Sequence, residues 1–203
     1  ISIIGTNKFK DASHEIIFDR IELGTYLIAG ALVGRKIILN KIKSSIIDTE
    51  IRILKKMGVK MKVEKNRITV FESKKINNIS IKTEAYPGFP TDLQAQIMVL
   101  MSKAAGKSKV KENIFENRFM HVPELKRMGA KINTKNNTAI ITGPTNLSGA
   151  EVMATDLRAS VSLVLAALVA DNKTIINRVY HLDRGYEDLE KKLKKCKAEI
   201  KRI

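Results

Sequence analysis

The sequence predicts an α/β fold in which three copies of one unit pack apolar helices inside small sheets. Three stretches, beginning at Asp19, Asp92 and Asp156, follow the same order of features, and such internal repetition indicates a repeat architecture. Each stretch opens with an apolar run that has no polar face, which for a helix predicts burial on every side. Alternating strands close the first two stretches. We therefore expect three buried helices, three amphipathic helices, and sheets that form walls around them.

The first copy covers residues 19–71. Its predicted elements are, in order, an apolar helix (25–33), a strand (36–39), an amphipathic helix (48–57) and a two-stranded hairpin (59–63 and 67–71). Gly58 follows the amphipathic helix, where a left-handed residue commonly ends a helix. The polar turn Glu64-Lys65-Asn66 separates the two strands of the hairpin.

The second copy covers residues 92–142 and repeats this order element for element. Its predicted elements are an apolar helix (97–105), a strand (108–112), an amphipathic helix (122–128) and a hairpin (130–134 and 138–142). Gly129 follows its amphipathic helix as Gly58 does in the first copy. The matching positions of the two glycines support a true repeat.

The third copy covers residues 156–203 and is incomplete. Its predicted elements are an apolar helix (161–170), a strand (174–179) and an amphipathic helix (186–195). Only residues 198–203 remain for the hairpin, so one strand is missing and the last strand has an unpaired edge. Lys197 stands where the other copies have glycine. A left-handed lysine costs about 1 kcal/mol, so we expect this helix to end differently.

An aspartate precedes each apolar helix and can cap its first turn through free backbone N–H groups. The three capped helix N-termini, each with partial positive charge, are therefore expected to converge on one site for an anion. The whole chain carries a net charge of +16, which also favours anionic partners.

Composition narrows the remaining classes. The lysines are scattered, and the chain has only six Phe, four Tyr and no Trp, so no stacking platform for nucleic acid is evident and we predict no nucleic-acid function. The single cysteine cannot form an internal disulfide, and no Cys/His cluster has metal-ligand spacing. No uncharged run reaches the roughly 20 residues of a membrane span. We expect a cytoplasmic protein without a metal.

Four segments carry a resemblance to a known family. They are YPGFPTDLQAQ (86–96), IFENRFMHV (114–122), MATDLRAS (153–160) and YHLDRGYE (180–187). In this order they resemble the UDP-N-acetylglucosamine enolpyruvyl transferases, which begin peptidoglycan precursor synthesis and so serve cell-wall biogenesis, cell shape and cell division. The shikimate-pathway enolpyruvyl transferases are paralogues that share the repeats but not the Asn-Arg-Phe-Met-His segment.

The resemblance implies an inside-out α/β barrel built of three repeats around buried central helices, one of two domains in the enolpyruvyl transferase fold. It implies that enolpyruvyl passes from phosphoenolpyruvate to the 3′-hydroxyl of UDP-N-acetylglucosamine, with release of phosphate and without a cofactor. The family's N-terminal companion domain carries a mobile loop with a catalytic cysteine and is absent from residues 1–203. We therefore expect the chain alone to be inactive.

Two residues match positions at the sugar nucleotide. Asp92 matches the family aspartate at the sugar hydroxyl, so the resemblance implies that it binds the substrate and is the general base. Without the resemblance, an aspartate after Pro-Thr is an ordinary helix cap. Ile114 matches a residue whose backbone contacts the UDP-sugar, although an isoleucine beside Phe115 also fits a hydrophobic core.

Arginines match the positions that face phosphoenolpyruvate. The resemblance assigns this role to Arg158 and Arg184, with Arg118 as a weaker third, and a guanidinium can hold a carboxylate or phosphate through two hydrogen bonds. Asp156 is a supporting residue that caps its helix and orients an arginine. The alternative is ion pairing with sequence neighbours, and the pairs considered are Arg158 with Asp156, Arg184 with Asp183 or Glu187, and Arg118 with Glu116.

Two further residues are assigned structural roles. His121 lies among Met120, Val122 and Pro123 and is interpreted as a hydrogen-bonded, partly buried histidine rather than a general acid. Cys196 occupies a position that is leucine in the family, and is interpreted as a small buried residue.

Two other classes of function remain open. A nucleic-acid-binding module would use the positive charge, and its affinity would fall steeply with salt. A non-catalytic partner protein would use the open hairpin edge and form a stable complex with a second chain. Neither accounts for the four family segments.

Overall fold

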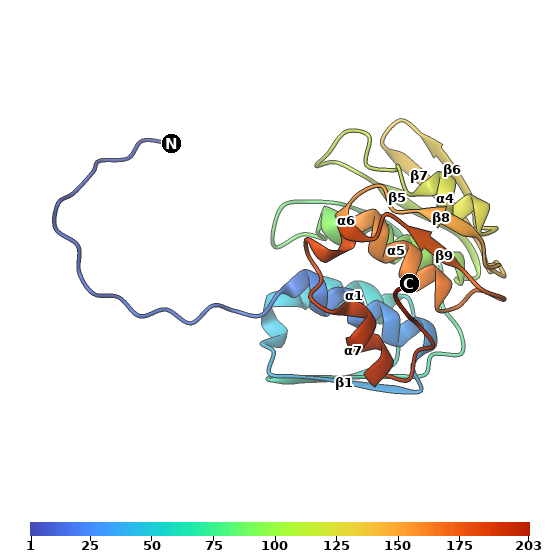
Figure 1. Ribbon diagram of the computed structural model, residues 1–203, viewed down its shortest axis with the longest axis horizontal. Helices are drawn as coiled ribbons and strands as arrows, with labels where there is room; N and C mark the ends of the chain where they lie inside the picture. The colour runs from blue at the N-terminus through green and yellow to red at the C-terminus, as the bar shows by residue number, and fades with distance from the viewer.

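The computed structural model describes all residues, 1–203, and three buried helices pack together inside the folded body. These helices are α1 (Arg20–Val33), α3 (Gln94–Ser102) and α5 (Leu157–Ala167), two of which, α1 and α5, are labelled in Figure 1. Both α1 and α5 pack against α3, and every residue of α3 is buried. The predicted apolar runs are therefore the buried helices of the fold, since no face of α3 is polar enough to meet water.

Three small sheets lie around these helices. The first has the strand order β1-β3-β2 and is antiparallel. Its strands are β1 (Lys36–Asn40), β2 (Met61–Glu64) and β3 (Arg67–Phe71). The inward residues of β3 complete the core below α1, since Ile68 and Val70 are fully buried.

The second sheet has four strands in the order β4-β5-β7-β6, with β4 parallel to β5 and the other pairs antiparallel. Its strands are β4 (Ser80–Lys82), β5 (Gly106–Lys111), β6 (Lys131–Lys135) and β7 (Thr138–Gly143). The third sheet contains only the parallel pair β8 (Glu151–Met153) and β9 (Ile175–Asn177). Both predicted hairpins are confirmed.

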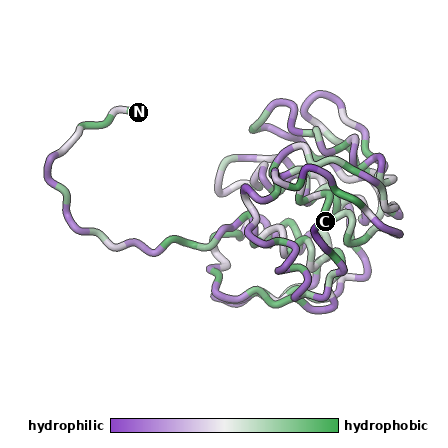
Figure 2. The backbone as a smooth tube through the Cα atoms, viewed as in Figure 1, coloured by the Kyte–Doolittle hydropathy of each residue, from purple (hydrophilic) through white to green (hydrophobic).

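Shorter helices join the strands. They are the 3₁₀ helices η1 (Ser44–Ile47) and η2 (Thr91–Leu93), and the α-helices α2 (Asp48–Lys56), α4 (Val122–Arg127), α6 (Tyr180–Asp183) and α7 (Leu189–Lys195). The hydrophobic segments gather in the middle of the folded body, and the hydrophilic ones follow its outer loops and turns (Figure 2). Residues 1–19 form no helix or strand and run away from that body (Figures 1 and 2).

The helices α2, α4 and α7 end in the same way, and the prediction for α7 was wrong. Gly58 and Gly129 have φ of +87° and +94°, and Lys197 adopts the same left-handed region at +69°. In each case the next N–H bonds back to a buried leucine carbonyl: Val59 to Leu54, Ala130 to Leu125 and Ala198 to Leu193, at 3.0, 2.9 and 3.1 Å. This is the Schellman pattern. Packing of the leucine outweighs the local cost at Lys197.

The rest of the third copy differs from expectation. The predicted helix over 186–195 begins only at Leu189, because Asp188 takes a left-handed conformation with φ of +48° that interrupts it. Residues 198–203 form no strand. The chain end is therefore not a hairpin remnant, and β9 pairs with β8 instead.

Candidate functional site

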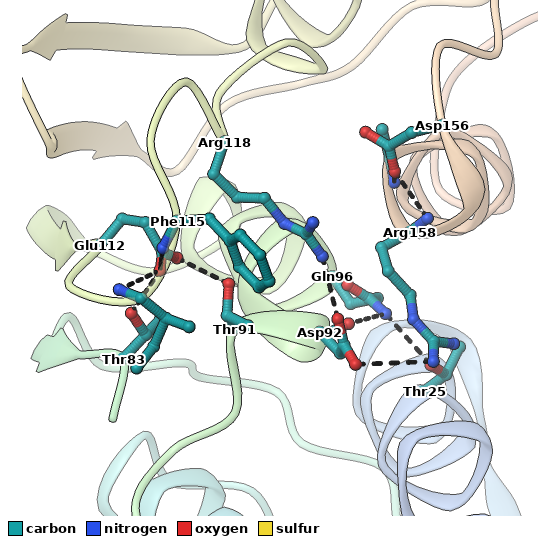
Figure 3. Close-up of polar contacts among 12 residues, drawn as sticks. Thr25, Thr83, Thr91, Asp92, Gln96, Glu112, Phe115, Arg118, Asp156 and Arg158 are labelled. Carbon is teal, nitrogen blue, oxygen red and sulfur yellow. Dashed lines mark hydrogen bonds and ion pairs between the residues drawn. The ribbon is translucent and has the colours of Figure 1, made fainter. Parts of the chain in front are cut away.

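The predicted site residues Asp92, Arg118 and Arg158 meet at the start of α3 (Figure 3). The prediction that an aspartate caps each buried helix holds for two of the three. Asp19 accepts from the N–H groups of Ile21 and Glu22. Asp156 does the same for the start of α5. Asp92 caps nothing, because it lies inside the 3₁₀ turn η2, and neither η2 nor α3 has a side-chain cap.

The carboxylate of Asp92 faces two arginines instead. Arg118 Nη2 donates to Asp92 Oδ1 at 2.9 Å, and Arg158 Nη2 lies 3.6 Å from Asp92 Oδ2. The Asp92 side chain keeps 38% of its surface exposed, against 22% for Arg118 and 16% for Arg158. One carboxylate is therefore shared between two cations at the edge of the core, with a side open to solvent.

Arg158 is held in place from its own helix. Asp156 Oδ1 accepts from the Arg158 and Ala159 N–H groups at 2.7 and 2.8 Å, so it fixes the first turn of α5. The Arg158 guanidinium lies over the Tyr186 ring, 5.7 Å from its centroid. Its Nη1 is buried without a hydrogen-bond partner. A buried donor without an acceptor is costly, and it leaves Arg158 able to bind a further anionic group.

A cluster of buried polar side chains lies next to Asp92 (Figure 3). Gln96 Nε2 donates to the Asp92 carbonyl oxygen at 2.8 Å and lies 3.4 Å from both Thr25 Oγ1 and the Tyr186 hydroxyl. Thr25 and Tyr186 are hydrogen-bonded to each other at 2.9 Å. Burial raises the pKa of Tyr186 above its usual value, although its hydrogen bonds oppose the shift, so the phenol stays neutral. Sequence reasoning missed all three residues, although Thr25 and Gln96 are polar residues at the starts of apolar runs.

The loop between β5 and α4 carries Ile114 and Arg118. This loop, with Asn136 and Asn137, lines an open pocket of about 520 Å³, a size that is ordinary for a small-molecule site. Ile114 is 43% exposed, so the structure contradicts a core position for it. Its backbone N–H donates to Glu112 Oε1 at 2.9 Å.

Arg184 is not joined to the other candidates. It is exposed directly after α6, and its side chain makes no ion pair or hydrogen bond within the chain. The alternative arginine pairings are also wrong. Arg118 and Arg158 pair with Asp92 rather than with their sequence neighbours, and Asp183 pairs with Arg202 instead of Arg184.

His121 and Cys196 correct two further predictions. His121 is fully buried rather than partly so, and its Nε2 has no hydrogen-bond partner. Burial lowers the pKa of His121 to about 4, and the nearby charge of Arg118 lowers it while that of Asp156 raises it. Cys196 is an exposed free cysteine and directly follows α7 at its C-cap position.

No group of three or more His, Cys, Asp or Glu side chains is placed to hold a metal ion. No helix is both long enough and apolar enough to cross a membrane. The geometry at Asp92 offers a proton acceptor next to two cations, which is suited to reactions of anionic substrates that carry a hydroxyl group.

The chain belongs to the EPSP synthase family (3-phosphoshikimate 1-carboxyvinyltransferase), which it matches over residues 1–193. Among its relatives, UDP-N-acetylglucosamine 1-carboxyvinyltransferase of Pelagibacter ubique (strain HTCC1062) is 60% identical over 203 residues, which are 100% of this chain and 49% of that protein. The protein of the same name from Granulibacter bethesdensis is 51% identical, with 100% and 48% covered. The chain thus spans about half the length of these relatives.

Solved structures agree with this family. The enolpyruvyl transferase NikO from Streptomyces tendae matches with a TM-score of 0.85 and 30% identity, over 92% of this chain and 44% of that one. An EPSP synthase from Acinetobacter baumannii matches with a TM-score of 0.59 and 15% identity, over 80% and 39%, which bears on the fold alone. The predicted enolpyruvyl transferase fold is confirmed.

Proposed function

We propose that the protein containing this chain transfers enolpyruvyl from phosphoenolpyruvate to the 3′-hydroxyl of UDP-N-acetylglucosamine, releasing phosphate. The observation that carries the proposal is the Asp92 carboxylate, which caps no helix and is shared by Arg118 and Arg158. The names of relatives at 60% and 51% identity support the same reaction.

The chemistry needs one base, one acid and several cations. The sugar hydroxyl adds to C2 of phosphoenolpyruvate while C3 takes up a proton; phosphate then leaves and C3 loses a proton, which restores the vinyl group. Asp92 accepts the hydroxyl proton. Arg158 and Arg184, with Arg118, hold the carboxylate and phosphate of phosphoenolpyruvate through charge-assisted hydrogen bonds. The Ile114 backbone binds the sugar nucleotide, and Asp156 supports Arg158.

We further propose that residues 1–203 are one domain of three repeats (about 19–71, 92–142 and 156–203), and that an N-terminal companion domain completes the cleft. Because the Arg184 side chain is exposed and has no partner within the chain, it is available to a substrate held between the two domains. In this proposal the protein acts in the cytoplasm, in peptidoglycan synthesis, and so contributes to cell shape and division. The 203 residues alone are expected not to catalyse the reaction.

The test is phosphate release from phosphoenolpyruvate in the presence of UDP-N-acetylglucosamine, with the full-length protein that carries this chain. Asp92→Asn keeps a polar side chain of the same shape but removes the base, and should lower kcat by about 10²- to 10⁴-fold. Arg184→Ala should raise the KM for phosphoenolpyruvate. Asp188→Asn is the matched control: Asp188 forms an exposed ion pair with Lys191 at 2.8 Å and has the left-handed conformation that Asn accepts readily.

Unchanged kcat and KM in both Asp92→Asn and Arg184→Ala, with melting temperatures like the wild type, would refute the site assignment. The family match also names 3-phosphoshikimate as an acceptor, which is the second candidate. 3-Phosphoshikimate is therefore assayed in parallel as the acceptor. Turnover with 3-phosphoshikimate but not with UDP-N-acetylglucosamine would make 3-phosphoshikimate the acceptor in the proposal.

A further inference from the structure

Glu112 is a buried carboxylate directly after β5, with only 2% of its surface exposed. Its oxygens accept four hydrogen bonds. Oε1 accepts from Thr83 Oγ1 at 2.7 Å and from the N–H groups of Ile114 and Phe115 at 2.9 and 3.2 Å. Oε2 accepts from Thr91 Oγ1 at 3.0 Å. No lysine or arginine pairs with Glu112, so neutral donors alone compensate for burial of its charge.

Three of the four donors come from segments that carry the candidate site, and the fourth, Thr83, follows β4 (Figure 3). Ile114 and Phe115 open the loop that leads to Arg118, while Thr91 opens the η2 turn and immediately precedes Asp92. The same two segments are also joined by the Arg118–Asp92 ion pair, at 2.9 Å. The two segments are thus joined twice, once by the buried hydrogen bonds to Glu112 and once by the Arg118–Asp92 ion pair, which is open to solvent.

We propose that Glu112 is a positioning residue, which sets the distance between the Ile114 backbone and the Asp92 carboxylate. This inference rests on the proposed function, in which Ile114 binds the sugar nucleotide and Asp92 takes its proton. Both contacts then act on one substrate molecule, and an error of about 1 Å between them can cost up to about 10²-fold in rate. Glu112 itself touches no substrate.

The arrangement distinguishes three substitutions. Thr91→Val removes only the bond between Glu112 and the Asp92 turn. Glu112→Ala removes all four bonds and releases both segments. Glu112→Gln keeps an oxygen for the three donors at Oε1, and its amide can donate to the Thr91 hydroxyl, which accepts as well as donates. The amide variant should therefore rescue what the alanine variant loses.

Steady-state kinetics on the full-length protein test the inference. Thr91→Val should lower kcat about 10-fold with little change in the KM for UDP-N-acetylglucosamine, and Glu112→Ala should lower kcat about 100-fold and raise that KM. Glu112→Gln should stay within about threefold of the wild type. Thr145→Val is the control, because Thr145 is also buried and donates to the Thr142 carbonyl but lies outside the site. It should leave both constants unchanged.

Amide hydrogen exchange separates the possible outcomes. The Ile114 and Phe115 amides should exchange slowly in the wild type and Thr91→Val, and rapidly in Glu112→Ala. If the wild type turns over but Thr91→Val has wild-type kinetics, the inference is overturned. If Glu112→Ala does not fold, the kinetics of Thr91→Val and Glu112→Gln still test the inference. If the wild type is inactive with both acceptors, the proposed function fails, and rapid exchange at Ile114 in the wild type would separately overturn the role of Glu112.

Discussion

The buried His121 should make the stability of the protein fall between pH 7 and pH 5. Burial lowers the pKa of its imidazole to about 4, with the Arg118 charge acting in the same direction and Asp156 against it. In the unfolded chain the pKa is near 6.5. Because the folded state favours the neutral ring, the stability is complete above the unfolded pKa. It is lost as the pH falls through 6.5 toward the folded pKa of about 4.

The magnitude follows from these two pKa values. Linkage gives a loss of about 2 kcal/mol in the free energy of unfolding between pH 7 and pH 5, and about 3 kcal/mol once the pH is below the folded pKa. For a chain of this size, about 2 kcal/mol corresponds to a fall of about 4 to 8 °C in Tm. His121 is only 1% exposed, so solvent screening reduces this effect little.

The assay compares the wild type with His121→Met, which has a similar volume and no titratable group. Urea unfolding at pH 7, 6 and 5 gives the free energy of unfolding of each protein. Other groups, such as the buried Glu50, whose pKa is raised by burial, titrate in both proteins and cancel in the difference. The wild type should lose about 2 kcal/mol more than His121→Met over this range. Parallel pH dependence in the two proteins would show that the reasoning is wrong.

Three further substitutions test the core and the helix ends. Tyr186→Phe should cost about 1 kcal/mol in the free energy of unfolding, because it removes the hydroxyl bound to Thr25 but keeps the buried ring; a loss near zero in urea unfolding would mean that this bond contributes nothing. Gly129→Ala should destabilise the protein by about 1 kcal/mol, and Lys197→Gly should stabilise it by a similar amount, because both residues have positive φ. The same sign of change in thermal unfolding of these two variants would contradict the shared helix ending.

The parts of the fold that could be predicted are those set by local pattern. The buried helices were readable because α1, α3 and α5 have no polar face, and the hairpins because polar turns divide alternating strands. The end of α7 was not readable, since Lys197 is unfavourable locally and is held left-handed by the packing around Leu193. The pairing of β8 with β9 is long-range and left no periodic signal in such short strands.

The candidate site was predicted less completely. Asp92 and Arg118 were identified by resemblance, but their ion pair joins residues from different segments, which neighbour-based reasoning could not find. The capping rule misplaced Asp92, because Pro-Thr-Asp before an apolar run also fits a 3₁₀ turn. Glu112 gave no signal at all, since an acidic residue after a strand of alternating lysines reads as exposed surface.

The three helix openings also allow a comparison within one molecule. Asp19 and Asp156 stabilise the starts of α1 and α5, whereas Asp92 occupies the corresponding place before α3 without doing so. A lost cap costs about 1 kcal/mol, so the start of α3 is less stable locally, while the Asp92 carboxylate can contact Arg118 and Arg158. In a repeated unit, a change in the conformation of one turn can therefore free an existing aspartate from helix capping, so that it serves another role.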